Sequence, residues 1–159
     1  MAKILIAYAS MSGNTEEIAE LIKSNLEPFG YNIDTEEIEH LDIQRLVEYD
    51  GILLGVYTWG NGDLPYEVED FYDEIENVDL TGKKAAIFGS GDRSYPEFCA
   101  AVDLLEEKLE LSGAEIVQKG LKIELAPESE EDIEQCNSFA ISFSKSLEES
   151  SLSKTCPVQ

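Results

Sequence analysis

The chain has 159 residues, the length of a single domain, and 43% of them are hydrophobic, which is enough for a packed core. Eleven Lys and Arg stand against 34 Asp and Glu, a formal net charge of -23 at pH 7. A surface of this charge repels nucleic-acid phosphates and anionic membranes. We therefore exclude nucleic acid and membranes as partners and expect basic proteins instead.

The cysteines and the histidine bear on the cellular compartment and on possible metal or catalytic sites. The cysteines Cys99, Cys136 and Cys156 are odd in number and widely spaced, which favours free thiols in a reducing, cytoplasmic compartment. With His40 as its one histidine, the chain offers little for a metal site or a catalytic set, and we expect neither. The apolar run from Ile4 to Ala9 is too short for a signal peptide or a membrane span.

In chain order, short apolar runs alternate with segments of helical period, the pattern of βαβ units. Three runs are continuously apolar, as strands buried on both faces of a parallel sheet are: Ile4 to Ala9, Ile52 to Tyr57 and Ala85 to Phe88. The more polar segment from Asn32 to Ile38 suits an edge strand. We expect a fifth strand between Ala114 and Ile123, broken near Lys119-Gly120.

The helices are predicted from apolar residues that share one face. The first begins at Glu16 and aligns Ile18, Leu21, Ile22, Leu26 and Phe29. A later one aligns Phe98, Val102, Leu105 and Leu109, and Gly113 is placed to end it. The last, near Glu128 to Leu147, aligns Ile133, Cys136, Ala140, Phe143 and Leu147.

Five strands and about five helices in alternation indicate an α/β fold with a doubly wound parallel sheet. One domain would span residues 1–149, and residues 150–159 would form a frayed tail. Such sheets bind ligands beyond the carboxyl ends of their strands at the switch point, so the loops after the first, third and fourth strands matter most.

The loop after the first strand reads Ser10-Met11-Ser12-Gly13-Asn14-Thr15 and leads directly into a helix. Its hydroxyls, the Asn14 amide and successive backbone N–H groups can form an anion cradle. The loop has no Lys or Arg and matches neither the triphosphate nor the dinucleotide glycine motif, so it suits one terminal monophosphate. An ordinary Ser or Thr N-cap explains the same residues equally well.

Each of the other two loops carries an aromatic residue among small polar ones. Trp59 lies in the loop from Thr58 to Pro65, and Tyr95 lies in the loop from Ser90 to Cys99. Two aromatics at a switch point can sandwich a flat ring. The alternative for Trp59 is burial against the adjacent helix.

Taken together, the three loops resemble those of short-chain flavodoxins, and the resemblance covers nearly the whole chain. Ser10 to Thr15 is similar to the phosphate loop S/T-x-T-G-x-T of that family, with Ser12 in place of the middle threonine. Thr58-Trp59-Gly60 resembles the segment whose tryptophan covers one flavin face. Gly91-Asp92-x-Ser94-Tyr95-x-x-Phe98-Cys99 resembles the segment whose tyrosine covers the other.

The resemblance implies a five-stranded, flavodoxin-like three-layer sandwich with strand order 2-1-3-4-5. It also implies non-covalent FMN, with backbone groups at the flavin pyrimidine edge and a turning peptide carbonyl at Gly60. The implied cofactor contacts are Ser10, Met11, Ser12, Gly13, Asn14, Thr15, Thr58, Trp59, Gly60, Asn61, Ser90, Gly91, Asp92, Tyr95, Glu97, Phe98 and Cys99. The expected function is low-potential one-electron transport between semiquinone and hydroquinone, by a monomer without catalytic residues of its own.

Eight acids, with no basic residue between them, follow the tryptophan loop: Asp63, Glu67, Glu69, Asp70, Asp73, Glu74, Glu76 and Asp79. They form either a solvated helix face or a steering patch for basic redox partners. By family resemblance, the partners are a ferredoxin- or flavodoxin-NADP reductase as donor and P450 or desaturase-type acceptors. Arg93 departs from the small polar residue that the family often has there, and it either raises the hydroquinone potential or points to solvent.

Three other functions share features of this sequence pattern. A flavodoxin-like quinone reductase needs a nicotinamide site, for which the chain shows no added loop. A response-regulator receiver needs acids where this chain has Tyr8 to Ser10 and Tyr57 to Thr58, so it is excluded. A flavin-bearing activator of ribonucleotide reductase remains an alternative.

Overall fold

The structure is a computed structural model that describes residues 3–9, 13–57, 66–91, 100–124, 127 and 129–155. The strands are β1 (Lys3–Tyr8), β2 (Asn32–Glu37), β3 (Gly51–Tyr57), β4 (Lys84–Gly91), β5 (Glu115–Ile116) and β6 (Leu121–Glu124). The α-helices are α1 (Asn14–Leu26), α2 (Glu69–Glu74), α3 (Ala100–Leu111) and α4 (Glu130–Thr155). Short 3₁₀ helices cover Glu27–Phe29, Ile38–His40, Ile43–Glu48, Tyr66–Val68 and Ile75–Asn77.

The strands form one parallel sheet in the order β2-β1-β3-β4-β5, and β6 also pairs with β4. β5 pairs with the start of β4 through Lys84 and Ala85, whereas β6 pairs with its end from Phe88 to Gly91. β5 and β6 are therefore two halves of the predicted fifth strand, interrupted at residues 117–120. The predicted strand order, the edge position of β2 and the break are confirmed.

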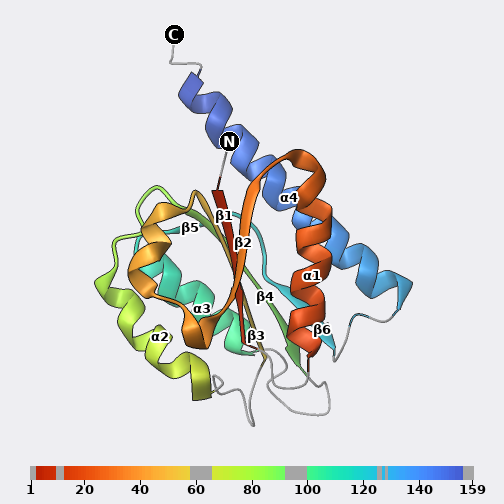
Figure 1. Ribbon diagram of the computed structural model, residues 1–159, viewed down its shortest axis with the longest axis horizontal. Coiled ribbons are helices and arrows are strands. Elements are labelled where there is room, and N and C mark those ends of the chain that lie inside the picture. The colour runs from red at the N-terminus through yellow and green to blue at the C-terminus, as the bar shows by residue number, and fades with distance from the viewer. Residues whose placement is uncertain are drawn as a thin grey trace.

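Helices cover both faces of the sheet, α1 and α4 on one and α2 and α3 on the other (Figure 1). The strands contribute buried side chains to both helix layers, because successive side chains of a strand point to opposite faces of the sheet. In β1, Ile4 and Ile6 pack toward α1 and α4, whereas Leu5 and Ala7 pack toward α2 and α3. The predicted continuous apolar strands are thus buried on both sides, and the three-layer sandwich is confirmed.

Gly55 allows the central strands to carry a large aromatic side chain. It is paired in register with Phe88 of β4, and a Cβ on Gly55 would overlap the Phe88 ring. The ring lies edge-to-face with Phe139 of α4, at 6.4 Å between centroids. The missing side chain in β3 therefore leaves room for the contact that joins β4 to α4.

The helix predictions are confirmed in part. Ile18, Ile22 and Leu26 are buried in α1, and Gly113 ends α3 with a φ of 101°. Phe29 was wrongly placed on the buried face: it lies in a 3₁₀ turn and is 46% exposed.

Other differences concern how many helices there are and how long they run. The described residues contain four α-helices rather than about five, because only short 3₁₀ helices connect β2 to β3. α4 begins at Glu130 and ends at Thr155, so it continues into the segment predicted as a tail (Figure 1). Between Leu147 and Thr155 there is no Gly or Pro to stop it, and Pro157 is the first such residue.

Candidate functional site

The three loops predicted to form the site follow the carboxyl ends of β1, β3 and β4, which are neighbours in the sheet. Tyr8 of β1 pairs with Gly55, and Tyr57 of β3 pairs with Ser90 of β4. The three loops singled out in the sequence therefore leave the sheet side by side, as a ligand site at a switch point requires.

The structure describes five of the predicted cofactor contacts: Gly13, Asn14, Thr15, Ser90 and Gly91. The others lie outside the described residues, namely Ser10, Met11, Ser12, Thr58, Trp59, Gly60, Asn61, Asp92, Tyr95, Glu97, Phe98 and Cys99. Arg93, Asp63 and Cys156 lie outside them as well.

The start of α1 has the form expected at an anion site. Its N-cap is Gly13, in the left-handed region at φ 88°, and the Gly13 carbonyl accepts the first helical hydrogen bond from the Glu17 N–H at 3.0 Å. Glycine is suited to this backbone conformation, and it carries no side chain that could cap the first turn. The N-cap is therefore not the serine or threonine of an ordinary cap, and a helix start of this kind can offer its backbone N–H groups to an anion.

Two buried hydroxyls join α1 to the end of β4. Thr15 Oγ1 lies 2.8 Å from Ser90 Oγ, and the two residues are 1% and 3% exposed. In β4, Ala86 and Phe88 face α1 and α4, so strand alternation places the Ser90 side chain on that same face. The sequence predicted Ser90 for its backbone groups only, although this alternation would have identified the direction of its hydroxyl.

Tyr8 and Glu16 are a second contact at this edge that the sequence analysis missed. The Tyr8 hydroxyl donates to Glu16 Oε2 at 3.2 Å. Burial raises the pKa of the Tyr8 phenol, and the negative charges of Glu16, Glu37 and Glu20 raise it further. The contact ties the end of β1 to the first turn of α1, on either side of the predicted phosphate loop.

The acidic segment after β3 divides into two groups in the described residues. Glu76 accepts a hydrogen bond from Lys108 at 2.6 Å, and Asp79 accepts hydrogen bonds from the backbone N–H and hydroxyl of Thr81, which lower its pKa. These two acids serve the fold. Four exposed acids on α2 have no ion-pair partner within the described part of the chain: Glu69, Asp70, Asp73 and Glu74.

A groove of about 610 Å³ runs beside these exposed acids. Three of its lining residues are buried and apolar: Ile38, Ile43 and Phe71. Four others are acidic: Glu39, Glu69, Asp70 and Glu74. Tyr66, at the entrance to α2, also lines the groove and is 85% exposed. The described part of the acidic segment therefore borders a surface that combines negative charge with apolar contact area.

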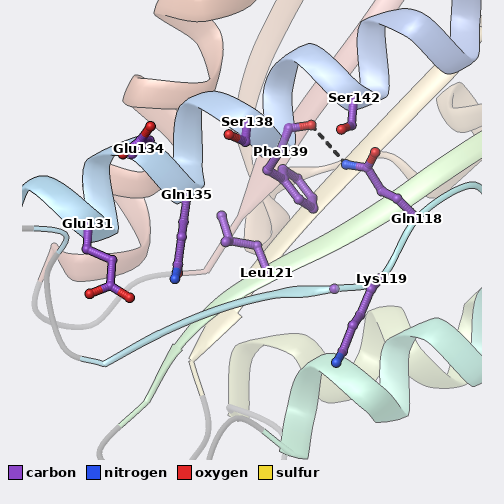
Figure 2. Close-up of a pocket in the computed structure, with 10 residues that line it drawn as sticks. Gln118, Lys119, Leu121, Glu131, Glu134, Gln135, Ser138, Phe139 and Ser142 are labelled. Carbon is purple, nitrogen blue, oxygen red and sulfur yellow. Dashed lines mark hydrogen bonds between the residues drawn. The ribbon is translucent and has the colours of Figure 1, made fainter.

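A second hollow, of about 480 Å³, lies between α4 and the connection from β5 to β6. Figure 2 shows Gln118 reaching from this connection to α4, where its Nε2 donates to the Phe139 carbonyl at 2.9 Å. None of the residues that line it was predicted as a cofactor contact. The hydrogen bond from Gln118 to Phe139 is one contact that holds the interrupted edge strand against α4.

The remaining chemistry-bearing side chains in the described residues are not arranged for catalysis. Burial, together with the negative charge of Asp132, raises the pKa of the Cys136 thiol to about 11, so the thiolate nucleophile is disfavoured. His40 lies on the surface, 3.8 Å from Glu37. Over the described ranges, no group of three or more His, Cys, Asp or Glu could hold a metal ion, and no helix is long and apolar enough to cross a membrane.

Comparison with known proteins identifies the family of this architecture. The family model described as Flavodoxin matches residues 6–139. Probable flavodoxin 1 of Bacillus subtilis is 55% identical over 143 residues, which are 90% of each chain. Oxidised flavodoxin 2 from Bacillus cereus superposes with a TM-score of 0.90 at 61% identity, over 91% of this chain and 99% of that one. A flavodoxin from Fusobacterium nucleatum bound to flavin mononucleotide shares the fold, at a TM-score of 0.78 and 17% identity over 92% and 99% of the two chains.

Proposed function

Because the chain belongs to the flavodoxin family, we propose that it is a low-potential one-electron carrier without substrate turnover of its own. FMN is its cofactor and electron transport is its functional class. The flavin supplies the redox chemistry, shuttling in this proposal between semiquinone and hydroquinone. The protein binds and orients the flavin, excludes water and sets the reduction potentials.

The phosphate of FMN would bind in the loop from Ser10 to Thr15. The glycine N-cap of α1 supports this placement, because it leaves the first-turn N–H groups directed at the loop without a capping side chain. Thr15 adds a hydroxyl fixed by its contact with Ser90. The loop has no basic residue, so the phosphate would be held by neutral dipoles.

The isoalloxazine ring would lie between Trp59 and Tyr95, with Thr58 beside the tryptophan. Backbone groups of Ser90 to Asp92 and of Glu97 to Cys99 would contact the pyrimidine edge. The neighbouring ends of β3 and β4 at Tyr57 and Ser90 support this placement, because both loops leave the sheet next to each other. Gly60 and Asn61 would allow the peptide carbonyl to turn when N5 of the ring gains a proton.

The charge of the protein would set the direction of electron flow. A fully reduced flavin carries a negative charge at N1, and each unit negative charge ~10 Å away costs roughly 0.4 kcal/mol at water-like dielectric. That energy corresponds to about 17 mV on a one-electron couple. With a net charge of -23, the protein would therefore hold the last electron weakly and deliver it to an acceptor.

The partners would be basic cytoplasmic redox proteins. A ferredoxin- or flavodoxin-NADP reductase is the proposed donor, and P450 or desaturase-type enzymes are the proposed acceptors. The exposed carboxylates of α2 and the adjoining groove support this choice, since they join negative charge to apolar surface in the segment that follows the tryptophan loop in the chain. A monomer would present this surface to each partner in turn.

The glycine-capped start of α1 beside a buried hydroxyl pair is the observation that carries the proposal furthest. Its test is the visible spectrum of the purified protein, followed by identification of the chromophore released on denaturation. A yellow protein that releases one FMN per chain is the expected result. Release of FAD, or a colourless chain that takes up no FMN, would contradict it. Oxidation of NADPH without a reductase would instead indicate a quinone reductase.

A further inference from the structure

The hydroxyl pair formed by Thr15 and Ser90 connects the proposed phosphate loop to the strand that leads into the ring loop. We infer that Ser90 is a positioning residue for phosphate recognition, because its hydroxyl donates to Thr15 Oγ1 and directs the Thr15 hydroxyl proton toward the FMN phosphate. This inference rests on the proposed phosphate cradle. It adds a side-chain role for Ser90 to the backbone role that the resemblance implied.

Either hydroxyl can be the donor in this contact, and the positions of the two residues show what each donor would do. Thr15 is the second residue of α1, two positions after the Gly13 N-cap, so it belongs to the first turn of the helix. Ser90 lies at the end of β4, and strand alternation turns its side chain toward α1. The 2.8 Å contact therefore reaches Thr15 from the side of the sheet.

The hydroxyl pair has two possible arrangements, which differ in which hydroxyl donates the hydrogen bond. Each hydroxyl has one proton, and their mutual hydrogen bond uses only one of the two. When Thr15 donates to Ser90, the Thr15 proton points away from an anion at the helix start. When Ser90 donates, the Thr15 proton is available to the anion, and accepting the Ser90 hydrogen bond strengthens Thr15 as a donor. A bound phosphate selects the second state.

The effect of the Ser90 hydroxyl on phosphate binding can be separated from any effect on ring binding by comparing two flavins. Riboflavin has the same isoalloxazine ring as FMN and lacks the phosphate. Ser90→Ala removes the hydroxyl and keeps the backbone groups proposed for the pyrimidine edge. A hydroxyl that acts through Thr15 therefore changes the affinity for FMN and leaves the affinity for riboflavin unchanged.

The experiment measures both dissociation constants by flavin fluorescence quenching, using the full chain freed of its flavin. The variants are Ser90→Ala, Thr15→Val and the double variant. Ser112→Ala is the matched control, since Ser112 is also a buried serine, but its hydroxyl donates to the Ile75 carbonyl in the 3₁₀ helix after α2. The thermal midpoint of each flavin-free variant checks that it is folded.

Ser90→Ala is expected to weaken FMN binding roughly three- to tenfold, the usual net effect of one hydrogen bond, with riboflavin binding unchanged. In the Thr15→Val background, Ser90→Ala should have no further effect on FMN. Ser112→Ala should bind both flavins like the unaltered chain.

Equal losses for FMN and riboflavin in Ser90→Ala, or an unchanged FMN affinity, would overturn the inference. A Ser90→Ala chain that fails to fold is replaced by Ser90→Cys, which keeps the side-chain volume with a weak donor and should show the same selective loss. If the unaltered chain binds FMN no more tightly than riboflavin, the phosphate cradle itself is wrong, and both proposals are overturned.

Discussion

Lys108 of α3 places its ammonium group 2.6 Å from Glu76 Oε1 and 4.4 Å from the ring centroid of Tyr72. The lysine thus connects the acidic segment around α2 to α3. The hydrogen bond with Glu76 raises the pKa of the lysine. The contact therefore joins α3 to α2, through Tyr72, and to the 3₁₀ helix that follows α2, through Glu76.

Replacing this lysine should loosen α2 without affecting flavin binding. We expect Lys108→Met to lower the thermal midpoint by a few degrees and to increase proteolytic cleavage within α2, since it removes the ion pair and the contact with the Tyr72 ring. Lys119→Met is the control, because Lys119 is an exposed lysine with the same charge. Equal midpoints for the two variants would show that the contact does not hold α2.

Neutralising the exposed acids of α2 should slow reduction by a basic reductase. We expect the triple change to lower the association rate about tenfold at low ionic strength, and the difference should disappear at high salt because the steering charge is screened. Stopped-flow reduction of the flavin over a salt series measures this rate. The substitutions are Glu69→Gln, Asp70→Asn and Glu74→Gln.

The control for that triple change removes the same charge elsewhere. Exposed acids of α3 and β5 serve this purpose, through Glu107→Gln, Glu110→Gln and Glu115→Gln. A local docking surface requires the control to retain most of the rate. Equal losses in the two triple variants would mean that only the net charge matters, and the exposed acids of α2 would then be an ordinary solvated face.

Tyr49 should give the fold a specific weakness at alkaline pH. Burial raises its pKa to about 12, aided by the hydrogen bond that its hydroxyl donates to Asp34 at 2.6 Å. An unfolded tyrosine ionises near pH 10, so the stability from neutral Tyr49 is complete below about pH 10 and is lost as pH rises toward 12. The free energy of unfolding should fall by about 2 kcal/mol over this window.

Denaturant titrations at intervals from pH 9 to pH 12 measure that fall. Tyr49→Phe should remove most of it, at the cost of lower stability at neutral pH, where the hydrogen bond to Asp34 is lost. Tyr66→Phe is the matched control, because the Tyr66 side chain is exposed. An unchanged pH dependence in Tyr49→Phe would show that this tyrosine does not control the alkaline transition.

Gly55, which is paired with Phe88, should tolerate an added side chain poorly. A methyl group at residue 55 would overlap the Phe88 ring, so we expect Gly55→Ala to destabilise the fold by about 1–3 kcal/mol. Chemical denaturation measures this loss. In a Phe88→Leu background the same substitution should cost less, because the ring is gone; an undiminished cost would place the strain elsewhere.

Much of the fold could be predicted because its strands are continuously apolar. Runs such as Ile52 to Val56 are buried on both faces, as the strands of a parallel sheet covered by two helix layers are. Phe29 was misplaced because helical spacing does not reveal that Pro28 and Gly30 make the chain turn there. The length of α4 was underestimated because its last turns lack the apolar spacing on which the prediction relied.

The sequence predicted the residues of the candidate site but not the contact between the two that the structure brings together. Loop position and residue type indicated Thr15 and Ser90, and both lie at the predicted edge of the sheet. Their mutual contact was not predicted, because it joins residues 75 positions apart in the chain. The aromatic pair Trp59 and Tyr95 lies outside the described residues, so its place on the flavin stays a prediction.

Low-potential transport of single electrons requires the flavin to be reduced in two separate steps. A potentiometric titration of the FMN-loaded protein, followed by its visible spectrum, measures these steps. Two separate one-electron steps are expected, with a stable one-electron-reduced flavin between them and the second step at markedly lower potential than the first. A single two-electron step, in which the intermediate never accumulates, would contradict the account.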